Sequence, residues 1–115
     1  PVRDGLRRYH GANTERMFRG WSDTWLRPTR RSWNVEVELP RVVCPTLLIQ
    51  GADDEYATRA QVDAIAVGVS GPTEILWLPA CGHVPHHQAR EPVLDAAARF
   101  IDGVCSNRYI VQPSI

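Results

Sequence analysis

The chain has 115 residues, of which 43% are hydrophobic, and its thirteen basic residues balance thirteen acidic ones. This composition is typical of a globular protein, and no apolar run approaches the roughly 20 residues of a membrane-spanning helix. The net charge of zero argues against a nucleic-acid-binding domain, which usually carries an excess of basic residues. We therefore expect neither nucleic acid nor a membrane as a partner, and one domain with a sizeable core.

The charge is unevenly distributed along the chain. Residues 1–31 contain eight arginines and three acidic residues, a local charge of plus five. Such a segment can be an anion-binding face, but the interpretation we favour is the solvated surface of a helix. Its apolar residues recur at a spacing of three and four: Leu6, Tyr9, Met17, Phe18, Trp21, Trp25 and Leu26. This spacing predicts a helix over residues 2–27 that is broken near Gly11 and ended by Pro28.

Three tryptophans, Trp21, Trp25 and Trp33, fall within and just after this helical segment. Aromatic side chains at such positions most often pack in a core. The alternative is that they form the wall of an apolar substrate pocket. We keep the pocket as the functional hypothesis for these residues.

Residues 31–44 are expected to form an irregular connector, after which the pattern indicates two strands that enclose a helix. The apolar run at residues 46–50 predicts a strand that is buried on both faces, as in a parallel sheet. Residues 58–61, Thr-Arg-Ala-Gln, fit a capping box at the start of a helix. Residues 73–78 then predict the second strand.

A final helix is expected to begin near Glu91-Pro92 and to end at Gly103. In the tail, residues 108–112 are either an edge strand or a loose end. The predicted organisation is a helical segment with a connector, a βαβα unit and a tail, at residues 1–44, 45–104 and 105–115.

Acidic and histidine side chains follow the two predicted strands. Asp53 and Asp54 come soon after the first strand, and His83 follows the second. A strand, a helix and a second strand almost always connect as a right-handed parallel unit, so both loops leave the same edge of the sheet. A carboxylate there can hold the imidazole in one tautomer and leave its other nitrogen to take a proton. The sequence therefore predicts a carboxylate–histidine pair.

Residues 44–54 read Cys-Pro-Thr-Leu-Leu-Ile-Gln-Gly-Ala-Asp-Asp, and residues 81–85 read Cys-Gly-His-Val-Pro. The first segment resembles the proline–strand–glycine-x-x-aspartate segment of the α/β-hydrolase family, and the second resembles its glycine–histidine loop. The resemblance covers residues 15–102 and implies a partial α/β-hydrolase fold, in which a parallel βαβ unit is flanked by N-terminal lid-like helices and a C-terminal helix.

The resemblance also implies functional roles. Asp54 corresponds to the acid of a catalytic triad, with Asp53 as the reserve candidate, and His83 corresponds to the base. The implied reaction is the hydrolysis of an ester, thioester or related bond in a small molecule, without a cofactor. The tryptophan-rich helices correspond to the end of the lid, and the substrate-binding candidates are Trp21, Trp25, Trp33 and His86.

The chain departs from the family pattern because it has no nucleophile elbow. Family members carry their nucleophile in a glycine-x-serine-x-glycine motif upstream of the acid and the base. None of the five serines lies in such a motif: Ser22, Ser32, Ser70, Ser106 and Ser114. We expect a truncated, acid–base half of a hydrolase that is nearly inactive alone.

Two other interpretations remain open. The first is a non-catalytic, hydrolase-like module that forms homo-oligomers through exposed sheet edges. The second is a metal site, because thiol, imidazole and carboxylate groups suit zinc. Its ligands would come from Cys81, His83, His86 and His87, with Asp53 or Asp54. We prefer no metal, and we interpret His86 and His87 as exposed loop residues near the mouth of a pocket.

The three cysteines, Cys44, Cys81 and Cys105, show no recognisable pattern. Their odd number argues against a disulfide framework and suits a reducing compartment. The first residues also lack a charged segment followed by an apolar stretch of signal-peptide length. We expect a cytoplasmic protein with free thiols.

Overall fold

The computed structural model describes residues 2–109. The chain divides into two compact units, residues 1–34 (unit 1) and residues 35–115 (unit 2), and each is described by itself. Residues 35–44, which the sequence pattern grouped with the helical segment, belong by their contacts to unit 2. There the backbone NH groups of Ser70 and Gly71 both donate to the carbonyl of Val42 at 3.0 Å.

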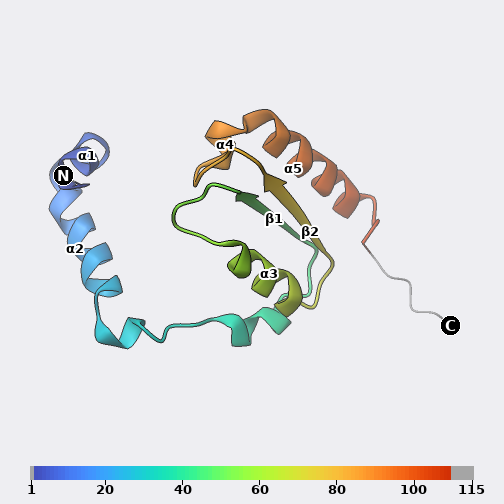
Figure 1. Ribbon diagram of the computed structural model, residues 1–115, viewed down its shortest axis with the longest axis horizontal. Coiled ribbons are helices and arrows are strands. Elements are labelled where there is room, and N and C mark those ends of the chain that lie inside the picture. The colour runs from blue at the N-terminus through green and yellow to red at the C-terminus, as the bar shows by residue number, and fades with distance from the viewer. Residues whose placement is uncertain (1, 110–115) are drawn as a thin grey trace. The chain divides into compact units, whose positions relative to one another are not determined.

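Unit 1 is helical (Figure 1). Gly11 has a φ of +50°, a left-handed conformation that breaks the helix where the sequence predicted a break. The elements on either side follow from this break: helix α1, Val2–His10; a 3-10 turn, Gly11–Asn13; helix α2, Thr14–Trp25; and a second 3-10 turn, Pro28–Arg30. Unit 1 is therefore a helical pair with a short extension.

Unit 2 contains the predicted strand–helix–strand unit and the last helix. Its elements in chain order are a 3-10 helix, Glu36–Arg41; strand β1, Thr46–Gly51; helix α3, Arg59–Gly68; strand β2, Thr73–Leu78; helix α4, Pro85–Gln88; and helix α5, Arg90–Cys105. At the start of α3 the Thr58 backbone NH donates to Gln61 Oε1 at 2.7 Å, as the capping box requires.

The two strands pair in parallel, from Thr46 opposite Thr73 to Gly51 opposite Leu78. Helix α3 lies against one face of this sheet and α5 against the other (Figure 1). The mixed α/β class and the parallel βαβ unit are confirmed. Because the strands are parallel and in register, the loops that follow Gly51 and Leu78 leave the same edge of the sheet.

The buried core is smaller than the chain length led us to expect. Among the described residues, four hydrophobic side chains are buried: Val62, Leu78, Cys81 and Ala96. All four belong to unit 2. A sheet of two strands offers little area on either face, so most apolar side chains stay partly exposed. No helix in residues 2–109 is long and apolar enough to cross a membrane.

The end of the last helix corrects one prediction. Gly103 does not stop α5, which continues to Cys105, and the chain turns at Asn107, where φ is +58°. Gly103 is buried, and the Tyr109 ring lies against it, only 3.0 Å from where a β-carbon would stand. The Tyr109 hydroxyl donates to Glu74 of β2. Most of the possible strand at residues 108–112 lies outside the described residues.

Candidate active site

The first loop of the site begins at Gly51, the last residue of β1. The Ala52 NH donates to the carbonyl of Leu78 at 2.8 Å, which carries the sheet pairing one step beyond the strands. The Asp53 NH then donates to the carbonyl of Cys81 at 2.9 Å. The loop after β1 is thus tied by main-chain hydrogen bonds to the loop after β2.

The second loop crosses directly over the end of β1. A β-carbon on Gly51 would lie 2.2 Å from the carbonyl oxygen of Cys81 and 2.3 Å from that of Gly82. Such approaches are far below van der Waals contact, so only glycine fits at this position. Ala80, at the start of the crossing, has a φ of +52°. The close crossing brings the loop that carries His83 against the loop that carries Asp54.

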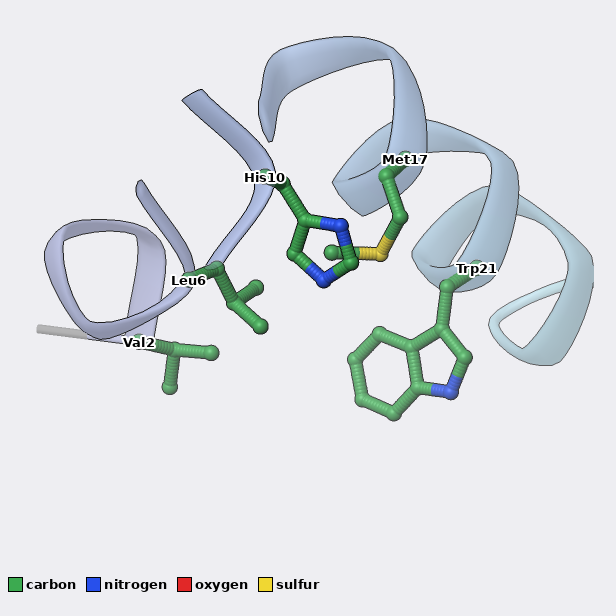
Figure 2. A pocket seen from close by; sticks show the side chains of 5 residues that line it. All are labelled: Val2, Leu6, His10, Met17 and Trp21. Carbon is green, nitrogen blue, oxygen red and sulfur yellow. The ribbon is translucent and has the colours of Figure 1, made fainter. Parts of the chain in front are cut away.

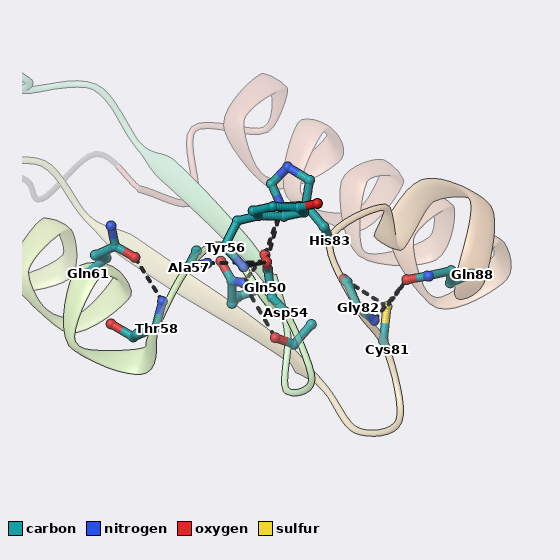
Figure 3. A network of polar contacts seen from close by, with 11 residues as sticks. Gln50, Asp54, Tyr56, Ala57, Thr58, Gln61, Cys81, Gly82, His83 and Gln88 are labelled. Carbon is teal, nitrogen blue, oxygen red and sulfur yellow. Dashed lines mark hydrogen bonds and ion pairs between the residues drawn. The ribbon is translucent and has the colours of Figure 1, made fainter. Parts of the chain in front are cut away.

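Asp54 and His83 form the predicted pair (Figure 3). His83 Nδ1 lies 3.0 Å from Asp54 Oδ2 and 3.1 Å from Oδ1. An ionised carboxylate can only accept, so the proton of the neutral ring lies on Nδ1 and the lone pair on Nε2. The Asp54 side chain is 5% exposed and the His83 side chain is 54% exposed. A buried carboxylate therefore orients an imidazole that remains open to solvent.

The Asp54 carboxylate is held by four donors. Burial raises the pKa of this carboxyl group, but the hydrogen bonds lower it by more, from 3.8 to about 2. In decreasing order of effect on the pKa, the donors are the backbone NH of Tyr56, the His83 ring, the Gln50 side chain and the backbone NH of Ala57. Asp54 is consequently ionised near neutral pH.

This pKa predicts how stability depends on pH. A carboxyl group with a lower pKa in the folded state adds stability that is complete above its unfolded pKa of 3.8 and is lost as the pH falls through about 2. We expect the midpoint of urea unfolding to drop between about pH 4 and pH 2, and Asp54→Asn to reduce this drop. Asp53→Asn, which removes the same charge one residue earlier, is the control. An equal drop in wild type and Asp54→Asn would contradict the prediction.

Gln50 and Tyr56 complete the surroundings of the pair. Gln50 Nε2 donates to Asp54 Oδ2 at 2.6 Å. The Tyr56 ring meets the His83 ring edge to face, with 4.8 Å between centroids. Gln50 of β1 therefore holds the carboxylate, and the Tyr56 ring packs against the imidazole (Figure 3).

Gln88 of α4 fastens the loop that carries the histidine. Its Oε1 accepts the backbone NH of Gly82 at 2.8 Å and lies 3.6 Å from the buried Cys81 thiol (Figure 3). Both contacts are on the two residues before His83. This anchor limits the movement of the loop and hence of the imidazole.

Sequence reasoning missed Gln50, Tyr56 and Gln88 as part of the site. One signal was available for Gln50, because a polar residue that ends a strand predicted to be buried on both faces needs a hydrogen-bond partner. In the structure residues 46–50 are half-buried, and Gln50 still makes that bond. No comparable signal marks Tyr56 or Gln88, since an aromatic ring in a loop and a glutamine in a short helix are common on any surface.

The other candidate residues lie as follows. Asp53 is exposed, and the structure joins Asp54 to the histidine instead. In unit 1, Trp25 and Trp33 meet edge to face at 5.5 Å, whereas Trp21 contacts Phe18; all three tryptophans are at least half exposed. Their assignment to a substrate pocket stays a prediction.

The expectation that His86 and His87 lie in a loop is wrong, because both belong to the short helix α4, where they are exposed and their rings lie 4.4 Å apart. Within residues 2–109, no group of three or more histidine, cysteine, aspartate or glutamate side chains is placed to hold a metal ion. The role of His86 in substrate binding stays a prediction.

Comparison with known proteins bears on the family to which the chain is related. The chain is 36% identical over 78 residues to the alpha/beta hydrolase domain-containing protein aho-3 of Caenorhabditis elegans. This similarity supports an α/β-hydrolase relation. It covers 66% of this chain but 23% of aho-3, so the chain spans less than a quarter of that relative. No protein-family model and no solved structure matches the chain.

Proposed function

We propose that Asp54 and His83 are the acid and the base of a hydrolytic triad of the α/β-hydrolase type. In this reaction His83 Nε2 takes the proton of a hydroxyl nucleophile as it attacks an ester or thioester carbonyl, and gives that proton to the departing alcohol or thiol. Water, deprotonated by the same nitrogen, then releases the acyl group as a carboxylic acid, and Asp54 stabilises the imidazolium that forms in both steps. The observation that carries the proposal is the contact of His83 Nδ1 with a buried, ionised carboxylate at 3.0 Å.

Three features support this role over a structural ion pair. The carboxylate accepts two backbone NH groups besides the histidine, so its orientation does not depend on the imidazole. His83 is 54% exposed, which leaves its second nitrogen accessible. Both loops start at the carboxyl ends of parallel strands, where α/β folds bind their ligands.

The nucleophile and the oxyanion-hole donors are proposed to come from residues outside these 115, because no serine here has the flanking glycines of the elbow. The small core and the exposed imidazole support this part of the proposal. A surface that packs beside the open side of His83 would supply the attacking hydroxyl and the oxyanion-hole donors.

The 115-residue chain is expected to hydrolyse short p-nitrophenyl esters no faster than a His83→Ala variant of the same chain. The reason is that a histidine base accelerates the reaction little when no nucleophile and no oxyanion hole are present. Loss of the oxyanion hole alone lowers the rate by about two to three orders of magnitude. A longer form with a glycine-x-serine-x-glycine motif ahead of residue 1 should turn over the ester and lose this activity in His83→Ala. Turnover by the short chain that disappears in His83→Ala would refute the missing nucleophile, and full activity of the longer His83→Ala form would refute the base.

Self-association through sheet edges remains a second candidate. In the described residues β1 and β2 pair only with each other, which leaves one edge of each strand without a neighbouring strand. Unpaired edges tend to recruit a partner. A non-catalytic dimer would use these edges and would not require the Asp54–His83 contact.

A further inference from the structure

Unit 1 has helices, but residues 2–34 include no buried hydrophobic side chain. Its buried residues among those described are Thr14 and Ser22, both polar. Its large apolar side chains are instead exposed: Val2 is 66% exposed, Trp21 57% and Trp25 50%. Several large apolar side chains exposed close together mark a surface that binds another molecule or a membrane.

Apolar side chains of both helices, some exposed and some half-buried, gather on one side of the helical pair. Val2 and Leu6 of α1 are four residues apart, as are Met17 and Trp21 of α2, so each pair occupies one face of its helix. Figure 2 shows these four side chains gathered around a shared groove. The groove has a volume of about 300 Å³, and His10 completes its lining. Both helices are amphipathic, and arginines flank the groove: Arg3 lies 4.4 Å from the centre of the Phe18 ring, and Arg16 lines an adjacent hollow together with Met17.

The charge of the unit indicates what covers the groove. Residues 1–34 carry eight arginines and three acidic residues, a net charge of plus five. Glu15 is engaged by Arg3 and Arg19, at 3.5 Å and 2.7 Å. A second copy of unit 1 would bring two such cationic faces together, which like-charge repulsion opposes. The partner should therefore be anionic at its surface and apolar beneath it.

We propose that α1 and α2 bind the surface of a bilayer that contains anionic lipids, with the groove facing the acyl region. Short amphipathic helices with arginine on the polar face and tryptophan on the apolar face lie in the interface between headgroups and acyl chains. Arginines beside the apolar face contact the anionic headgroups. The expectation of no membrane partner rested on the lack of a spanning segment, which interfacial helices do not need.

Nucleic acid fits this surface less well. Bases need polar partners for their edges or several flat rings on which to stack, and the groove offers aliphatic side chains, one indole and one imidazole. An acyl chain needs only the apolar lining. The proposal does not depend on Asp54 or His83, so a test of membrane binding is independent of a test of the hydrolytic role.

Vesicle binding by the 115-residue chain tests the proposal. We expect the chain to cosediment with vesicles of equal parts phosphatidylcholine and phosphatidylserine, and at least about tenfold less with pure phosphatidylcholine vesicles. The emission of the tryptophans should shift to shorter wavelength on binding. Salt that shortens the Debye length to about 3 Å should weaken the binding strongly.

Two variants and two matched controls identify the surface. Trp21→Ser and the double change Arg7→Gln with Arg8→Gln should each lower binding about tenfold. Val67→Ser and Arg99→Gln make the same kinds of change at exposed positions of unit 2 and should bind as wild type does. If Trp21→Ser loses helix content by circular dichroism, Val2→Ser replaces it.

Three results would overturn the proposal. The first is no binding to the anionic vesicles, and the second is binding that Trp21→Ser and Val2→Ser leave unchanged. The third is binding of single-stranded RNA, or concentration-dependent dimerisation, with no vesicle binding, because either would give the groove a different occupant.

Discussion

Gly51→Ala is expected to destabilise unit 2 by about 3 kcal/mol or more, which is a large part of the stability of a unit with so small a core. The added β-carbon would lie 2.2 Å from the Cys81 carbonyl oxygen and 2.3 Å from that of Gly82. Both contacts are with backbone, so no side-chain rotation relieves them. Either the loop that carries His83 lifts away from β1, or the main-chain hydrogen bonds between the two loops break.

Urea unfolding of Gly51→Ala measures this loss. Gly82→Ala is the matched control in the same loop, because the atoms nearest to its β-carbon are the ends of two flexible side chains, Gln88 at 3.3 Å and Glu55 at 3.5 Å. We expect this control to change the stability by less than about 1 kcal/mol. If Gly51→Ala proved as stable as Gly82→Ala, the two loops would not cross as closely as described.

Asp54→Asn is expected to reverse the tautomer of His83. The carboxylate can only accept, whereas an asparagine side chain can turn its NH₂ group toward Nδ1, which then becomes the acceptor and leaves the proton on Nε2. A ring that is protonated on Nε2 cannot take a proton from a nucleophile. In a form of the protein that carries the nucleophile, the expected fall in kcat is about four orders of magnitude.

Nitrogen NMR of the neutral His83 ring tests the tautomer in the 115-residue chain without any need for activity. Wild type should show the proton on Nδ1, and Asp53→Asn, the matched control, should leave it there. A wild-type ring with the proton on Nε2 would remove the basis for calling His83 a base. An unchanged tautomer in Asp54→Asn would show that the carboxylate does not control it.

Local sequence patterns were sufficient to predict the strands and the helix that position the site. The apolar runs at residues 46–50 and 73–78 form the strands, and Thr58 with Gln61 begins the helix between them. These patterns succeed because strand burial and helix capping depend on residues close together in the chain. The handedness of βαβ connections then placed the two loops at one edge without further information.

Contacts between distant residues were not accessible in the same way. The sequence predicted a carboxylate beside His83 and favoured Asp54 over Asp53 only through a family resemblance. The structure joins Asp54 to the imidazole, because the turn after Gly51 directs its side chain inward and leaves Asp53 exposed. Gly103 gave a wrong prediction. A glycine near the end of a helix pattern indicated that the helix ends there, whereas in the structure the missing side chain leaves room for the Tyr109 ring.

By itself, then, the sequence determined a parallel strand–helix–strand unit that delivers an acidic loop and a histidine loop to the same sheet edge. Only the tertiary structure decided that these loops cross in contact at Gly51, that Gln50 and two backbone NH groups hold the carboxylate, and that Gln88 anchors the histidine loop. The physical reason is the separation along the sequence. Periodicity and helix capping depend on residues a few positions apart. The close crossing of the loops and the hydrogen bonds of the carboxylate depend on segments about thirty residues apart, which meet only after folding.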